Sequence, residues 1–359
     1  MKIKNSLKLS FLLLFLVSYS YAASSKIGTT AVQFLKLGIG AENAAMGNIG
    51  VSNTQNGNAI YWNPANIENL TKKEFSFSHT IWFEDINYEW LSFVLPTAQA
   101  GNFGIAAQYV SYGSIDKVDI SGTKNGSFSP TDLAIYLSYS NHYKNFMFGG
   151  NLKYINTTIE NSASAFALDF GTTYQIDSKT SLGFAFSNLG TKIKFNNEEE
   201  ELPLIFKIGG SHNIIDNLLL AVDLSFPNDN DLYINFGGQY LILLGDMFDL
   251  KLRAGYDGRN KDIPGFNWLN FGFGIGFNDL SFDYAFVPCG DIGMTHRFSF
   301  SIKFGNDTND VSVIKNKEEK KKAKDEQKKL KRAKFLNKKG GRRINEDRIN
   351  PTKKYTNWR

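Results

Sequence analysis

The sequence is poor in the residues on which catalysis, metal binding and disulfide bonding depend. It has one cysteine among 359 residues, Cys289, so no disulfide forms within the chain. Four histidines stand far apart, without the spacing of metal ligands: His79, His142, His212 and His296. No Ser/His/Asp order, phosphate-binding loop or Cys/His pair stands out. The sequence therefore predicts no enzyme, no catalytic residue, no metal site and no cofactor.

Long apolar runs are also scarce. The run at residues 9–17 is too short to cross a bilayer as a helix, and it follows three lysines. Small residues end it at Ser20-Tyr21-Ala22. This pattern predicts a signal peptide over residues 1–22, with a retained signal anchor as the alternative. The remaining chain then either folds in the periplasm or spans an outer membrane as a β-barrel.

Aromatic residues and glycine are abundant, with 30 Phe, 16 Tyr and 32 Gly. After residue 72, apolar side chains alternate with small or polar ones, which is the period of a β-strand. In the last segment Phe298, Phe300, Ile302 and Phe304 alternate with polar residues, as expected of a strand between lipid and water. We therefore predict an all-β fold, a 14-stranded antiparallel transmembrane β-barrel over residues 73–304. The expected strand centres are Ser78, Phe93, Ala107, Tyr136, Gly150, Phe170, Phe184, Ile208, Val222, Phe236, Arg253, Phe273, Tyr284 and Phe300.

The connections between these strands alternate in length. The short ones are 141–144, 177–179, 214–217 and 277–279, and the longer ones are 113–130, 189–202, 258–267 and 288–294. Short periplasmic turns and long outer loops are typical of outer-membrane barrels. An even strand number then predicts that both termini are periplasmic. A soluble double sandwich is the alternative, but it does not require this alternation.

Residues 23–72 lack the period of a strand. Short helix-favouring segments at 31–37 and 41–46 are interrupted by glycine, and a compact turn is expected at 59–66 because of its proline. We expect this segment to form a short helical plug, or hatch, inside the barrel lumen. The alternative is a helical element on the periplasmic rim.

The charge is concentrated at the end of the chain. Residues 306–359 contain 19 Lys and Arg against 8 Asp and Glu, whereas residues 23–304 contain 18 basic and 27 acidic residues. We expect 305–359 to be a basic periplasmic tail that is largely disordered or helical. Two hypotheses remain open for it: a solvated extension, or a contact for an acidic periplasmic partner, the cell wall or anionic headgroups. Nucleic acid is not expected as a partner.

Charged residues also lie on the predicted inner face. Four aspartates are expected to pair with four basic residues there, because a barrel interior must satisfy its charges: Asp169, Asp223, Asp249 and Asp283 with Lys153, Lys207, Lys251 and Arg253. Gly272, Gly274 and Gly276 line one face of a strand, which predicts close approach by something in the lumen, with the plug as the candidate. The acidic run at 198–201 is expected to be a solvated loop rather than a cation site.

Three stretches together resemble the PorV/PorQ family of outer-membrane proteins. The segment Gly28–Gly47 is similar to the family's mature N-terminus. A hatch motif follows at Trp62, Asn63, Pro64 and Ala65, and its Asn-Pro-Ala triplet is shared with FadL-type fatty-acid transporters. The closing-hairpin motif comprises Asp283, Tyr284, Pro288, Gly290, Asp291, His296, Arg297 and Phe304.

The resemblance implies a FadL-like barrel with an N-terminal hatch and a role in type IX secretion. In that role the barrel holds or shuttles a protein partner at its extracellular loops. Two alternatives are FadL-like transport of hydrophobic small molecules and a tether from the outer membrane to the cell wall through the tail. Two features depart from the family pattern: the chain continues for 55 residues beyond Phe304, and Cys289 occupies the last loop.

Overall fold

A computed structural model describes residues 28–84, 86–195, 197–260 and 266–308. The chain divides into two compact units, residues 1–304 and 305–359, and the first contains the whole barrel. The predicted signal peptide and nearly all of the predicted basic tail lie outside the described residues. No helix among the described residues has both the length and the apolar character needed to cross a membrane.

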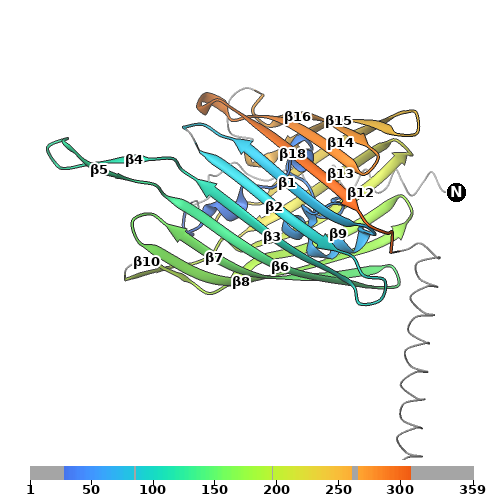
Figure 1. The fold of residues 1–359 in the computed structure, drawn as a ribbon, viewed down its shortest axis with the longest axis horizontal. Coiled ribbons are helices and arrows are strands. Elements are labelled where there is room, and N and C mark those ends of the chain that lie inside the picture. Colours follow the sequence, from blue (N-terminus) through green and yellow to red (C-terminus); the bar gives the residue numbers. More distant parts are fainter. Residues whose placement is uncertain (1–27, 85, 196, 261–265, 309–359) are drawn as a thin grey trace, which may run out of the picture. The chain divides into compact units, whose positions relative to one another are not determined.

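Fourteen antiparallel strands form a closed barrel, which confirms the predicted fold class (Figure 1). The barrel strands are β1 (Lys73–Ile81), β2 (Asn87–Leu95), β3 (Asn102–Ser111), β6 (Thr131–Tyr143), β7 (Phe146–Thr158), β8 (Ser162–Asp177), β9 (Thr180–Gly190), β12 (Ile205–Ile215), β13 (Leu218–Pro227), β14 (Tyr233–Leu244), β15 (Phe248–Asp257), β16 (Leu269–Phe277), β17 (Leu280–Pro288) and β18 (Met294–Phe304). Each predicted strand centre falls inside one of them.

The barrel closes where its first strand pairs with its last. Lys73 of β1 lies opposite Phe304 of β18, and Ile81 lies opposite His296. Closure removes the exposed strand edges, so every strand has a hydrogen-bonded neighbour on both sides. A membrane-spanning sheet needs this arrangement because lipid offers no partner for backbone N–H and C=O groups.

The two ends of the barrel differ in their connections. One end, here called the short-turn end, has the tight connections, such as 144–145, 178–179 and 278–279. The opposite, long-loop end has the connection 112–130, which contains the hairpin β4 (Ile115–Val118) and β5 (Lys124–Phe128). It also has the hairpin β10 (Ile193–Phe195) and β11 (Glu198–Glu200). The sequence located these loops but did not predict that they contain strands; the first hairpin extends well beyond the barrel (Figure 1).

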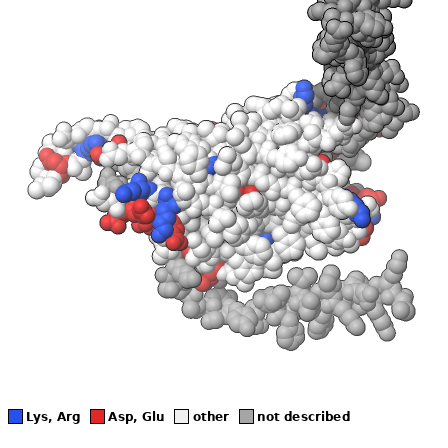
Figure 2. Space-filling view, turned by 90° about the horizontal axis from the view of Figure 1, so that it is seen from below, with Lys and Arg blue, Asp and Glu red and all other residues white. Residues whose placement is uncertain are grey.

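Alternating burial separates the two faces of the wall. In β1, Glu74, Ser76 and Ser78 are buried, whereas Phe75 and Phe77 are exposed. The same alternation recurs in the other barrel strands and produces an apolar outer surface suited to lipid. Figure 2 shows a side of the molecule with few charged residues on the barrel wall and more of them toward its ends.

The segment before β1 lies inside the barrel and fills its core. Its helical elements are short: η1 (Gln33–Lys36), α2 (Ala41–Ala45), α3 (Ala59–Trp62) and η2 (Pro64–Asn69). Two further short 3-10 elements lie in loops at the long-loop end: η3 (Gly258–Asn260) and η4 (Gly290–Ile292). Ala41, Ala44, Ile49 and Ile60 of this segment are fully or almost fully buried. The short helical plug is thus confirmed, and the segment expected as one turn at 59–66 is two short helical elements.

Candidate functional site

Inward carboxamides of the barrel wall hold the backbone of the plug. Each donates a hydrogen bond of 2.7 to 2.8 Å to a plug carbonyl oxygen: Asn102, Gln108, Asn151, Asn235 and Asn270. These donors come from strands distributed around the barrel, so the plug is fixed from several directions. Short helices leave many backbone groups unpaired, and the wall supplies the missing partners.

Carboxylates of the wall bind plug N–H groups in the same way. Asp223 Oδ2 accepts hydrogen bonds from the N–H groups of Gly50 at 2.8 Å and Val51 at 3.2 Å. Glu74 Oε1 accepts one from the N–H of Gly57 at 2.6 Å. Both carboxylates are buried. Hydrogen bonds to a charged acceptor are the stronger kind, and they compensate part of the desolvation of these groups.

Three of the four predicted ion pairs of the lumen are present. Lys153 and Asp169 lie 2.7 Å apart, Arg253 and Asp283 2.6 Å, and Lys251 and Asp249 2.9 Å. The predicted fourth pair is different. Asp223 binds the plug backbone as described above, and Lys207 Nζ lies 4.6 Å from the ring centroid of Trp62. Asp223 and Lys207 each contact the plug instead of pairing with each other. The strand pattern alone does not reveal these contacts.

The Asn-Pro-Ala triplet attaches the plug to the inner face of the barrel wall. Asn63 is fully buried; its Nδ2 donates to the carbonyl oxygen of Val51 at 2.7 Å and to Thr173 Oγ1 at 3.0 Å. Its Oδ1 accepts a hydrogen bond from the N–H of Ala65, which caps η2. A Cβ at Gly149 would collide with the backbone of Pro64. The motif therefore fixes the plug against β7 and β8.

Trp62 links two segments of the plug to each other. Its Nε1 donates a hydrogen bond of 3.0 Å to the carbonyl oxygen of Ile39, and the side chain is almost completely buried. This hydrogen bond connects α3 to the segment that precedes α2.

The glycine face of β16 was predicted to have a close neighbour in the lumen, with the plug as the candidate; all three glycines have such a neighbour, and at Gly272 it includes the plug. A Cβ at Gly272 would approach Ala45 of the plug. At Gly274 it would meet Asp283 and Arg253, and at Gly276 it would meet Asp249. Charged side chains from neighbouring strands therefore occupy most of the space that these glycines leave.

The closing-hairpin residues divide between the two faces of β17 and β18. Asp283 and Arg297 point inward, and Arg297 donates to the carbonyl oxygens of Gly38 at 3.1 Å and Leu37 at 3.4 Å. Tyr284 and His296 pair on the outer face, with Tyr284 Oη 2.8 Å from His296 Nδ1. Phe304 also points outward; Pro288, Gly290 and Asp291 lie at the last loop of the long-loop end. The hairpin contacts α2, whereas the hatch motif packs against β6, β7 and β8, so the two motifs do not form one site.

At the long-loop end, residues 28–36, here called the strap, are hydrogen-bonded to the loops that connect the strands. Lys36 Nζ lies 2.6 Å from Asp229 Oδ2, and Gln33 Nε2 donates to the same oxygen at 3.0 Å. Thr30 also donates to Asp229, and the N–H of Ala31 donates to the carbonyl oxygen of Glu201. Burial would raise the pKa of Asp229, but hydrogen bonds from Lys36, Thr30 and Gln33 outweigh it and hold this pKa below its usual value.

The described chain therefore begins and ends at opposite ends of the barrel. The strap lies at the long-loop end, while Phe304 lies beside Lys73 at the short-turn end. The sequence prediction placed both termini on the periplasmic side, with the plug entering from there. Both termini lie outside the described residues; within the described residues, the plug runs through the lumen before β1 begins.

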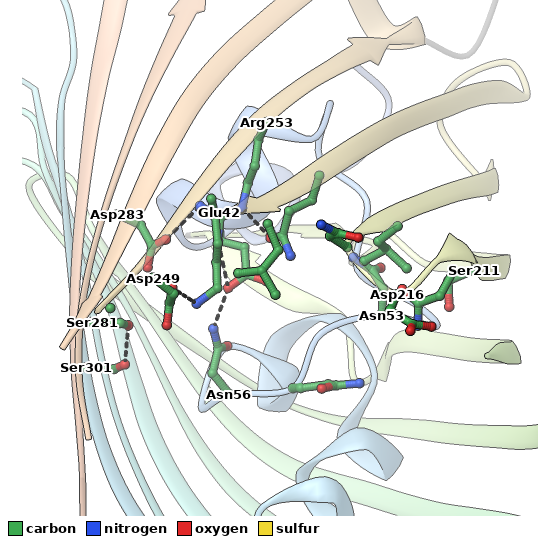
Figure 3. A pocket seen from close by; sticks show the side chains of 18 of the residues that line it. Glu42, Asn53, Asn56, Ser211, Asp216, Asp249, Arg253, Ser281, Asp283 and Ser301 are labelled. Atoms are coloured by element: carbon green, nitrogen blue, oxygen red, sulfur yellow. Dashed lines mark hydrogen bonds and ion pairs between the residues drawn. The ribbon is translucent and has the colours of Figure 1, made fainter. Parts of the chain in front are cut away.

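A cavity of about 400 Å³ opens at the short-turn end (Figure 3). Glu42 and Asn56 of the plug line one side, and Asn56 Nδ2 donates to Glu42 Oε2 at 2.8 Å. Asp249, Arg253 and Asp283 face them from the wall. This mouth of the lumen is polar and charged. Among the described residues, no group of three or more His, Cys, Asp or Glu side chains is arranged to hold a metal ion.

Residues 20–227 match the family of the type IX secretion system protein PorV. The match covers more than half of the chain. This chain belongs to the PorV family. It is therefore an outer-membrane barrel of a secretion family, as the three sequence stretches indicated. No curated protein matches the chain.

Several solved structures that share the fold are described as channels or transporters of aromatic hydrocarbons. A monoaromatic hydrocarbon channel, the TodX deltaS2S3 mutant, matches with a TM-score of 0.54 and 13% identity over 74% of this chain and 99% of that chain. The toluene transporter TbuX of Ralstonia pickettii has a TM-score of 0.52 and 12% identity, over 75% and 99%. TodX of Pseudomonas putida has 0.51 and 12%, over 74% and 96%. Identities this low show a shared fold and nothing about substrate.

Proposed function

We propose that this PorV-family barrel is a plugged docking platform that holds a protein partner of a type IX secretion pathway at its long-loop end. The observation that carries the proposal is the plug, whose backbone is hydrogen-bonded to inward side chains around the wall. A lumen filled in this way is suited to presenting a surface rather than to passing a chain through it.

The proposal requires that the long-loop end faces outward and the short-turn end faces the periplasm. The distribution of connection lengths supports this orientation. We also infer four parts of the chain: a signal peptide at 1–22, the plug at 23–72, the barrel at 73–304 and a periplasmic tail at 305–359. The plug and barrel boundaries are supported by the start of β1 at Lys73 and the end of β18 at Phe304.

The hairpin β4–β5 is the docking element that we propose. It extends beyond the barrel, and its apolar residues Ile115, Val118 and Ile120 are exposed, Ile120 completely. An exposed apolar side chain at the end of a long hairpin is a suitable anchor for a protein partner. The loops 189–202 and 288–294 would complete the surface.

Substitution of the hairpin's apolar residue tests this function. Ile120→Ser should reduce co-purification of secretion-system components from mildly solubilised outer membranes by about tenfold, which corresponds to the loss of one apolar anchor of about 1.4 kcal/mol. Met247→Ser is the matched control, because Met247 is an exposed apolar residue in a connection at the short-turn end. Equal recovery with both variants, or recovery of the barrel alone from the wild type, would contradict the proposal.

The two alternatives receive different support. The lining of the short-turn cavity is polar, which does not favour a hydrophobic substrate at that mouth. The tether hypothesis concerns the tail, which lies outside the described residues. Deletion of residues 311–359 should weaken association of the barrel with the cell wall if the tether exists; unchanged association would eliminate it.

A further inference from the structure

The chain contains the dipeptide Asn-Gly twice, and the fold places the two copies in different surroundings. Asn56-Gly57 belongs to the plug, inside the barrel, whereas Asn125-Gly126 belongs to β5 of the hairpin β4–β5. In this dipeptide the backbone nitrogen of the glycine can attack the side-chain amide of the asparagine, because glycine has no Cβ to obstruct the approach. A comparison of the two copies therefore isolates the effect of the fold on this reaction.

Hydrogen bonds restrain the reacting atoms of the copy in the plug. The N–H of Gly57 donates to Glu74 Oε1 at 2.6 Å. Asn56 Nδ2 donates to Glu42 Oε2 at 2.8 Å, and Asn56 Oδ1 accepts a hydrogen bond from the N–H of Asn58 at 3.0 Å. Attack by the Gly57 nitrogen would break its hydrogen bond to a charged acceptor and would remove a proton next to a carboxylate. The fold therefore protects Asn56.

The copy in the hairpin lies at a β-bulge. The register shifts between Asp116 and Val118 of β4, so that two residues of β5, Asn125 and Gly126, lie opposite Lys117 alone. A bulge of this kind leaves a residue out of the hydrogen-bonded ladder. Both residues of the dipeptide are exposed, and Gly126 has a φ of +97°. A Cβ built on Gly126 would have no neighbour within 4 Å, so the backbone around this nitrogen has room to move.

We propose that Asn125 is a modification site at which the hairpin itself converts asparagine to aspartate or isoaspartate. The Gly126 nitrogen loses its proton and bonds to Cγ of Asn125, while the bond from Cγ to Nδ2 breaks and ammonia leaves with that proton. Water then opens the cyclic imide. Opening at Cγ gives aspartate, and opening at the backbone carbonyl carbon gives isoaspartate. The net change is the exchange of one ammonia for one water, with no enzyme and no oxidant.

The products change the hairpin in two ways. Both add a negative charge to β5, and isoaspartate also adds a methylene group to its main chain. The added length disturbs the pairing next to the bulge, where Lys124 lies opposite Val118 and forms an ion pair of 2.7 Å with Asp116. The same hairpin carries Ile120, the proposed anchor, so modification weakens docking as the protein ages. This consequence rests on the proposed function, whereas the modification itself does not.

Peptide mass spectrometry of the full-length barrel tests the modification. The folded protein is kept in lipid vesicles in mildly alkaline buffer over days, since attack requires loss of the proton from the glycine nitrogen. We expect the peptide that contains Asn125 to gain the mass difference between an amide and a carboxylic acid. In the same sample Asn56 should react about tenfold more slowly or less, because its reaction first breaks a hydrogen bond to a charged group.

The unfolded chain and two variants are the controls. In denaturant, Asn56 and Asn125 should react at similar rates, because each is followed by glycine. Asn125→Gln should abolish the mass change at this position, and Gly126→Ala should slow it because its Cβ obstructs the attack. Gel mobility before and after heating confirms that the barrels are folded. Equal rates at Asn56 and Asn125 in the folded barrel, or no change at Asn125 while the denatured chain reacts, would overturn the proposal.

The effect on docking has its own measurement. Aged wild-type barrel should recover fewer secretion-system components than fresh barrel, whereas Asn125→Gln should recover the same amount before and after ageing. Modification of the wild type without loss of recovery would contradict the effect on docking. Ile120→Ser keeps its own outcome in co-purification of fresh protein, and the mass measurement needs no partner. The modification and the proposed function can therefore fail separately.

Discussion

The two halves of the plug are attached to the barrel by different chemistry. The inner half, from α2 to η2, is held by many buried hydrogen bonds between its backbone and wall side chains such as Asp223, Asn151 and Asn270. In the strap at 28–36, three side chains share one carboxylate, Asp229, while Gln108 and Arg259 bond its backbone carbonyls. The polar side chains that hold the inner half come from many strands, whereas the polar side chains of the strap converge on a single titratable group.

This difference indicates which contacts of the plug can be lost without destabilising the barrel. Loss of one hydrogen bond from a distributed set leaves a buried group unpaired and destabilises the whole barrel. Loss of the shared carboxylate at the long-loop mouth affects only a segment that lies next to surface loops. Protonation or substitution of this one group therefore removes several strap contacts at once, at the end proposed to bind a partner.

The largest effect is expected from Asp223→Ala. It leaves the buried N–H groups of Gly50 and Val51 without an acceptor. The free energy of unfolding in lipid vesicles should fall by about 2 to 4 kcal/mol, since each unpaired buried donor costs about 1 to 3 kcal/mol. Asp223→Asn keeps an acceptor oxygen and should lose less. Equal stability of the alanine variant and the wild type would show that the inner half is not fixed in this way.

A smaller effect is expected where β7 meets the hatch motif. Gly149→Ala places a methyl group against the backbone of Pro64 and should destabilise the plug by about 1 to 3 kcal/mol. Increased cleavage of the plug by protease in otherwise folded barrels would measure this change. Gly210→Ala is the control, because its methyl group would meet only Leu182 Cδ2, at 3.5 Å. The comparison fails if both variants are cleaved at the same rate.

Much of this structure follows from strand periodicity. Alternation along the barrel strands identified which side chains point to lipid and which to the lumen, and three ion pairs followed from that assignment. Periodicity cannot say which plug atom lies opposite an inward side chain. Lys207 over Trp62 and the contact of Arg297 with the plug were missed for that reason.

The position of the strap was missed for a related reason. The sequence marks the plug as a segment without strand period, but its direction through the lumen depends on contacts between distant residues. Asp229 lies in a turn after β13, and it is 193 residues from Lys36. An acidic residue in a short polar turn carries no signal that distinguishes an anchor from a solvated side chain.

The smallest effect is expected from protonation or substitution of Asp229. It tests the difference between the strap and the inner half of the plug directly, because Asp229 contacts the strap. The pKa of Asp229 is lowered in the folded state, so its stabilising contribution is present above the unfolded value, near pH 4, and is lost as the pH falls through the lower folded value. Hydrogen exchange of residues 28–36 should accelerate in that window. Asp229→Asn should remove the pH dependence and weaken the strap by about 1 kcal/mol at pH 7.

The inner half of the plug is the internal reference for this experiment. Its exchange should respond little to Asp229→Asn, because its contacts lie with Asp223, Asn63 and the carboxamides of the wall. Asp216→Asn is the matched substitution, since Asp216 forms an ion pair of 2.7 Å with Lys179 but is almost fully exposed at the short-turn end. Exposed pairs contribute little. If Asp229→Asn and Asp216→Asn left strap exchange equally unchanged, the strap would be held by its apolar contacts, and the two halves of the plug would not differ in the way described above.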